Sequence, residues 1–175
     1  MAYEELSKGR GLDCNRISGG VKYIYFSVYD DFARADWAYA SGTEGEIDTI
    51  NFQSSTIYRY AVPRGSTTAN ESLTGSVENG TLFYTPTVNM VINRLTKEDQ
   101  NQIKLLGQTQ VRIFAQLNAT HSATGNDVII CMGMHNGMSM NAGTADSGAA
   151  FGDRNGYTLT FDGLEAQPFA MLEDV

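Results

Sequence analysis

Residues 66–94 read STTANESLTGSVENGTLFYTPTVNMVINR and predict one long β-hairpin. The Asn79-Gly80 pair favours a turn, because both residue types tolerate the positive φ that tight hairpins require. Successive side chains of a strand point to opposite faces, so each arm has a mostly neutral polar face and a mostly apolar face. Each arm is about twice the usual five or six residues of a strand. A hairpin this long commonly reaches beyond its own domain, which favours a role in assembly over one in catalysis.

The two faces of this hairpin differ in chemistry and predict one exposed and one buried surface. Glu71 and Gly75 are the exceptions on the apolar face. We expect the neutral face to be formed by Thr68, Asn70, Ser72, Thr74, Ser76, Thr85, Thr87 and Asn89. We expect the apolar face to pack on the core through Leu73, Val77, Leu82, Tyr84, Val88, Met90 and Ile92.

The rest of the chain alternates β-prone runs with turn residues. A helix is predicted to begin at Thr96, which starts a Thr-x-x-Asp pattern close to a capping box, and to end at Gly107. We expect a loop at 32–45 that holds a short helical turn near 32–39 and a longer loop at 134–155. Strands are expected at 21–29, 47–52, 56–62, 110–118, 127–133 and 156–161. These signals predict an extended N-terminal arm at 1–18 and a single domain at 19–175. Its fold class is mainly β, a β-sandwich or small β-barrel with the long hairpin and one flanking α-helix.

Composition limits the partners of the chain. Its 175 residues include 20 acidic and 12 basic residues, for a net charge of −8, and the basic residues form no cluster. A nucleic-acid grip requires phosphate-neutralising patches, so specific DNA binding is not expected. The acidic N-terminus lacks the apolar core of a secretion signal, and no run approaches the roughly 18 apolar residues of a membrane span. We therefore expect synthesis in a cytoplasm and no membrane insertion.

No motif of the sequence indicates catalysis or a cofactor. His121 and His135 lie in no recognisable nucleophile–base pattern, and no phosphate-binding glycine loop is present. Residues 153–156 resemble part of a calcium loop but lack the downstream glutamate of a complete one. Cys14 and Cys131 are expected to be buried free thiols, with a disulfide or a reactive thiol as alternatives. The interpretation is a protein without catalytic residues, metal or cofactor.

The order of these elements resembles that of the tail tube proteins of tailed bacteriophages. Two segments carry the resemblance, the opening Gly19-Gly-Val-Lys-Tyr-Ile-Tyr-Phe26 and the ending Asn155-Gly-Tyr-Thr-Leu-Thr-Phe-Asp-Gly-Leu-Glu165. The resemblance implies hexameric rings that stack into a tube for DNA delivery, within a virion made in the host bacterial cytoplasm. It implies that residues 66–92 line or support the channel and that 1–18 and 134–155 bridge rings. The implied partners are further copies of the chain, a tape measure protein, a terminator and a sheath or baseplate.

Two other interpretations stay open at this point. A neck, tail-terminator or baseplate ring component of a virion would share the fold and differ in copy number and stacking. A carbohydrate-binding β-sandwich would use tyrosine and tryptophan side chains to stack on sugar rings, although the aromatic residues form no cluster in the sequence. A tube agrees best with the neutral hairpin face, because hydroxyl and amide groups offer no cationic sites to hold phosphates.

Overall fold

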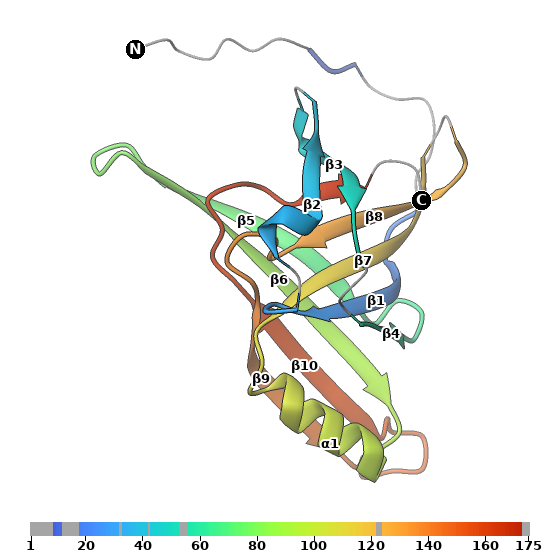
Figure 1. Ribbon diagram of the computed structural model, residues 1–175. Coiled ribbons are helices and arrows are strands. Elements are labelled where there is room, and N and C mark those ends of the chain that lie inside the picture. The colour runs from blue at the N-terminus through green and yellow to red at the C-terminus, as the bar shows by residue number, and fades with distance from the viewer. Residues whose placement is uncertain are drawn as a thin grey trace.

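A computed structural model of the chain describes residues 9–11, 18–31, 33–41, 43–52, 56–121 and 124–172 (Figure 1). These residues form eleven strands and one α-helix, with a 3-10 turn at Arg34–Asp36. The α-helix is α1 (Lys97–Leu106), and the strands are β1 (Val21–Val28), β2 (Trp37–Ala40), β3 (Thr43–Ile50), β4 (Ile57–Ala61), β5 (Thr68–Ser76), β6 (Thr81–Asn93), β7 (Val111–Thr120), β8 (Asp127–Met132), β9 (Ser139–Asp146), β10 (Gly156–Asp162) and β11 (Ala170–Leu172).

The strands form two sheets, so the mainly β fold class with one helix is confirmed. The seven-stranded sheet has the order β2-β3-β11-β8-β7-β1-β4, and the four-stranded sheet has the order β5-β6-β10-β9. Every pair in the four-stranded sheet is antiparallel. The predicted hairpin supplies two of its four strands, and Gly80 adopts the expected positive φ of 62° in the turn. In Figure 1 the strands of the two sheets run in different directions, with α1 beside the β9 end of the smaller sheet.

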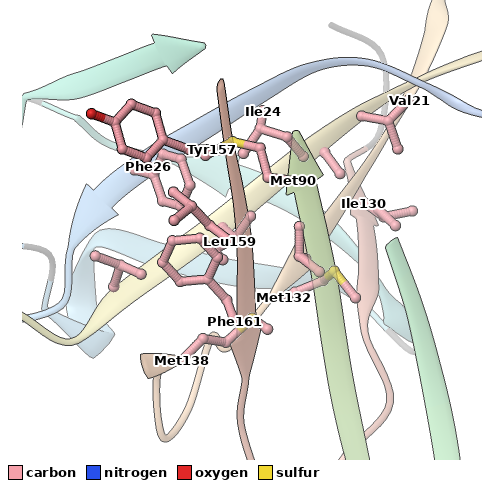
Figure 2. Close-up of a cluster of buried hydrophobic side chains, with 14 residues drawn as sticks. Val21, Ile24, Phe26, Met90, Ile130, Met132, Met138, Tyr157, Leu159 and Phe161 are labelled. Carbon is pink, nitrogen blue, oxygen red and sulfur yellow. The ribbon is translucent and has the colours of Figure 1, made fainter. Parts of the chain in front are cut away.

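The main core lies between the two sheets. The seven-stranded sheet contributes residues such as Ile24 and Ile113, and the four-stranded sheet contributes Met90, Leu159 and Phe161, each 0–1% exposed (Figure 2). Burying one such side chain contributes about 1.5–3 kcal/mol to stability. The cluster as a whole therefore fixes how one sheet packs on the other.

A second, smaller core covers the other face of the seven-stranded sheet. It contains Trp37, Ile47, Phe114 and Cys131, all at most 3% exposed. Strand β7 contributes to both cores, since its residues 111–115 are all buried. Cys131 is a buried free thiol, as expected, and burial raises its pKa. Cys14 lies outside the described residues.

Helix α1 forms where its capping signals predict it. The side-chain oxygen of Thr96 accepts a hydrogen bond from the backbone N–H of Asp99 at 3.0 Å and satisfies one of the free donors of the first turn. Ile103 and Leu106 pack against the main core, so these two apolar residues of the helix face inward. Gly107 ends the helix, and a Cβ there would lie 2.8 Å from the methyl carbon of Met140, so glycine also allows β9 to approach.

Three segments predicted as irregular contain strands. The loop expected at 134–155 includes β9, whose eight residues are exposed except for half-buried Met140, so no hydrophobic alternation marks it. The C-terminal segment, for which no strand was expected, contributes β11, which pairs with both β3 and β8. The helical turn expected at 32–39 is confined to Arg34–Asp36, because residues 37–40 form β2. Of the predicted arm 1–18, only residues 9–11 and 18 are described.

The apolar face of the hairpin is buried over only part of its length. Val88 and Met90 are fully buried, and Tyr84 and Ile92 are partly buried. The other three expected core residues are exposed: Leu73 at 61%, Val77 at 101% and Leu82 at 56%. The prediction was wrong for these three because the turn end of the hairpin projects past the seven-stranded sheet (Figure 1).

Charged substitutions at buried and exposed positions of the apolar face test which of its residues pack on the core. Val88→Asp or Met90→Asp would bury an unpaired charge, which costs several kcal/mol of a total stability of about 5–15 kcal/mol. We expect both variants to unfold or to become insoluble. Val77→Asp changes the exposed turn end of the same hairpin and should melt like the wild type. Thermal unfolding followed by circular dichroism measures all three, and wild-type melting of the Val88 and Met90 variants would show that the faces are assigned wrongly.

Candidate functional site

The most distinctive surface of the protein is the outer face of the four-stranded sheet. Strand pairing places each neutral residue of β5 opposite a residue of the same β6 face, for example Asn70 opposite Thr87 and Ser72 opposite Thr85. The hydroxyl-rich and amide-rich residues of both arms therefore share one face. All of the predicted members are exposed or partly exposed, namely Thr68, Asn70, Ser72, Thr74, Ser76, Thr85, Thr87 and Asn89.

Strands β10 and β9 extend the same face beyond the hairpin. Thr160 pairs with Asn89, and its hydroxyl donates a hydrogen bond to the Asn89 side-chain oxygen at 2.8 Å. The register between β10 and β9 continues the surface to the far edge of the sheet. We call the outward residues of all four strands together the neutral face. They are the eight hairpin residues named above and Thr81, Phe83, Val91, Asn93, Ser139, Ala142, Thr144, Asp146, Thr158, Thr160 and Asp162.

The charges of the neutral face are few and lie toward its β9 side. Asp146 and Asp162 are its carboxylates, and Asp162 accepts a hydrogen bond from the Asn141 side-chain amide at 2.9 Å. Arg154, in the loop before β10, brings one guanidinium to the hydroxyl of Thr158 at 2.8 Å. The same guanidinium also donates to the carbonyl of Tyr157 at 3.2 Å. The hairpin half of the face carries no ionisable side chain.

Both outer strands of this sheet have a free edge. Among the described residues, β5 pairs only with β6 and β9 pairs only with β10. Unpaired backbone N–H and C=O groups at an edge are a template for pairing with another chain. With four antiparallel strands, β5 and β9 run in opposite directions, so a β9 edge placed beside a β5 edge would continue the antiparallel pattern.

Two carboxylates on the inner side of the four-stranded sheet bind the backbone of two segments that connect this sheet to the larger one. The Glu71 carboxylate accepts the backbone N–H of Phe169 at 2.9 and 3.2 Å through its two oxygens. The Glu165 carboxylate, in a side chain only 4% exposed, accepts the N–H of Asn136 at 2.9 Å. Burial raises the pKa of both carboxyls, and the negative charge of Glu165 adds to the rise at Glu71. Glu71 is therefore the polar exception on the apolar face of β5 because its carboxylate binds the backbone N–H of Phe169.

His135 and the buried Arg112 make packing and hydrogen-bond contacts within the protein. The ring of His135 packs against Trp37, and its Nε2 lies 2.9 Å from the Tyr39 hydroxyl. Arg112 is 3% exposed and donates to the carbonyls of Met134 and Tyr29 at 3.1 and 2.7 Å. His121 is exposed at the end of β7. The described residues contain no group of three or more histidine, cysteine or acidic side chains placed to hold a metal ion.

The sequence predicted the hairpin part of the neutral face, and strand pairing in the structure added the part formed by β10 and β9. The contributions of β9 were missed because its exposed residues carry no hydrophobic period, whereas the alternation of Thr158 and Thr160 with Tyr157 and Leu159 was a readable signal. The expected bridging roles of 1–18 and 134–155 stay predictions, and the former lies largely outside the described residues.

The chain has no significant match among protein-family models, curated proteins or solved structures. No helix in the described ranges is long and apolar enough to cross a membrane.

The raised pKa of Glu165 predicts a pH dependence of stability. A carboxyl with a higher pKa in the folded chain binds more protons when folded, so stability falls as pH rises from about 4.3, the unfolded value, through the folded pKa. Glu165→Gln keeps an acceptor for the Asn136 N–H and removes this charge. We expect the unfolding midpoint of the variant to fall less over that window than the midpoint of the wild type.

Asp127→Asn provides a control of opposite sign. A hydrogen bond from Lys22 lowers the pKa of Asp127, so this carboxylate stabilises the folded chain above its unfolded pKa, and the variant loses that gain. Urea unfolding midpoints at a series of pH values measure both effects. Parallel pH curves for Glu165→Gln and the wild type would contradict the raised pKa of Glu165.

Proposed function

We propose that the protein is a structural subunit that assembles into rings and stacked rings around a channel for DNA, as in a bacteriophage tail tube. The observation that carries the proposal is a four-stranded sheet with a neutral outer face and two free, oppositely directed edges. The proposal assigns no catalysis, cofactor or metal to the chain. Its partners are further copies of the chain and other tail components, and its final location is the virion tail after synthesis in the host cytoplasm.

The free edges support ring closure. If β9 of one copy pairs with β5 of the next, each contact joins two different surfaces, and a rotation between copies that closes gives a ring. Closure also removes every exposed edge of this sheet, which is how barrels avoid open-ended aggregation. The neutral face would then lie on one side of a continuous antiparallel barrel. The hexameric count comes from the family resemblance.

The chemistry of the neutral face supports a channel through which DNA slides. DNA affinity depends mainly on Lys and Arg contacts to phosphates, and the hairpin half of the face has none. Hydroxyl and amide groups keep water at the surface and hold no phosphate strongly. Asp146, Asp162 and the overall charge of −8 add repulsion, which favours passage over retention.

Negative-stain electron microscopy of the purified protein over a range of concentrations tests the assembly. Tubes are expected from the proposal. Isolated rings that never stack would favour a terminator, neck or baseplate component of the same kind of particle. Stable monomers at all concentrations would contradict ring assembly and favour a binding module such as a carbohydrate-binding sandwich.

A charge placed on the neutral face tests the channel. Ser72→Lys with Thr74→Lys adds two cations per subunit on the hairpin half, and both positions are exposed, so folding and assembly should persist. Each new phosphate contact should steepen the log–log salt dependence of DNA retention by about 0.9. We expect assembled variants to retain DNA at low salt and to release it as salt rises, measured by co-sedimentation.

Gln100→Lys with Asn101→Lys is the matched control, because it adds the same charge at exposed positions of α1. If the control retains as much DNA as the channel variant, the effect is one of net charge and the neutral face does not line the channel. The same conclusion follows if the Ser72 and Thr74 variant assembles normally but binds DNA no better than the wild type.

A further inference from the structure

The turn end of the β5–β6 hairpin is an exposed apolar knob. Leu73, Val77 and Leu82 are 61%, 101% and 56% exposed, and Figure 1 shows this end projecting away from the rest of the protein. We call these three residues and the intervening turn the tip. Glu78 is the only ionisable residue of the turn, because residues 74–83 contain no other charge. In an isolated subunit the tip keeps apolar side chains in water without packing them.

An open apolar groove of about 200 Å³ lies between α1 and the edge of the seven-stranded sheet. Tyr58 and Leu105 stand at its exposed side, at 50% and 56% exposure. Lys104 precedes Leu105 and is the only charged residue in the second half of α1. The other apolar residues that line the groove are Phe26, Val28, Tyr60, Leu106 and Val111.

The tip and the groove of one subunit cannot meet. Strand β6 has 13 residues, begins at the tip and ends four residues before α1 starts. At about 3.3 Å per residue it spans roughly 40 Å. Figure 1 shows the tip and α1 at opposite ends of the four-stranded sheet. Any contact between these two surfaces must therefore join two copies of the chain.

We propose that the tip of one subunit docks in the α1 groove of a subunit in the next ring, with Glu78 beside Lys104. This docking rests on the proposed tube and names one contact that stacks its rings. The two surfaces differ, so the contact is head-to-tail and each added copy leaves a new tip and a new groove free. Such a contact continues along the strand direction of the four-stranded sheet, whereas β5–β9 pairing proceeds sideways. One chain thus carries two separate contacts, one within a ring and one between rings.

The docking surface is small, so stable stacking requires several tip–groove contacts at once. Three apolar side chains bury far less than the roughly 1,200 Å² of a stable independent interface. Rings that present several tips to several grooves at once turn each later contact into an intramolecular one and gain avidity. Single subunits should therefore remain separate through this contact, and stacking should require rings.

Single substitutions at exposed positions separate stacking from ring formation. Val77→Asp and Leu105→Asp should melt like the wild type, form rings and fail to stack, as seen by electron microscopy. Leu164→Asp, at a residue 61% exposed outside the tip and the groove, is the control and should still form tubes. Glu78→Lys and Lys104→Glu should each shorten the stacks, and the two together should restore them. Tubes of wild-type length from Val77→Asp, or no rescue by the charge exchange, would overturn the docking.

A disulfide distinguishes failure of the docking from failure of the tube. Val77→Cys with Leu105→Cys, in a Cys14→Ser background, should form oxidised ladders between copies, while each single cysteine variant yields dimers at most; buried Cys131 is retained. Tubes without such ladders would overturn the docking and leave the tube proposal standing. Ladders with no rings under any condition would uphold the docking and overturn the tube. Neither ladders nor assemblies would overturn both.

Discussion

The pairing of β6 with both of its neighbours is the constraint on which the rest of the structure depends. It aligns with β5 at nine positions and with β10 at seven, and its even-numbered residues from Val88 enter the main core. The period of two in a strand ties these roles together, because a shift of one residue would exchange the buried and exposed faces of the whole sheet. Burial of Val88 and Met90 therefore also fixes which side chains form the neutral face.

The neutral face and the hydrophobic core are two consequences of one alternation. A sheet packed on one side only must present its other side to water or to a partner, and here that side is rich in hydroxyl and amide groups over all four strands. Such a surface is suited to a lining that stays hydrated. The free edges of β5 and β9 suit repetition of the same sheet around an axis.

The two inward carboxylates show how the smaller sheet is tied to the larger one. Glu71 on β5 and Glu165 after β10 each accept a backbone N–H from a segment outside the four-stranded sheet. These hydrogen bonds join the inner side of the four-stranded sheet to neighbouring segments, and burial of the carboxyls raises the pKa of each. Attachment on the inner side leaves the outer face and the tip exposed.

The sequence by itself determined the local elements with strong signals: the 66–94 hairpin, its two-faced alternation, the Asn79-Gly80 turn and the α1 helix with its Thr96 cap. These depend on residues close in the chain, whose periodicity and turn chemistry are readable. Only the tertiary structure decided that β9 completes the sheet, that β11 joins the other sheet and that Leu73, Val77 and Leu82 lie outside the core. An edge strand that buries only Met140 in part leaves no hydrophobic pattern, and an apolar stripe does not show how far the opposing sheet extends. All three outcomes depend on partners that are distant in the sequence, which is why local pattern could not supply them.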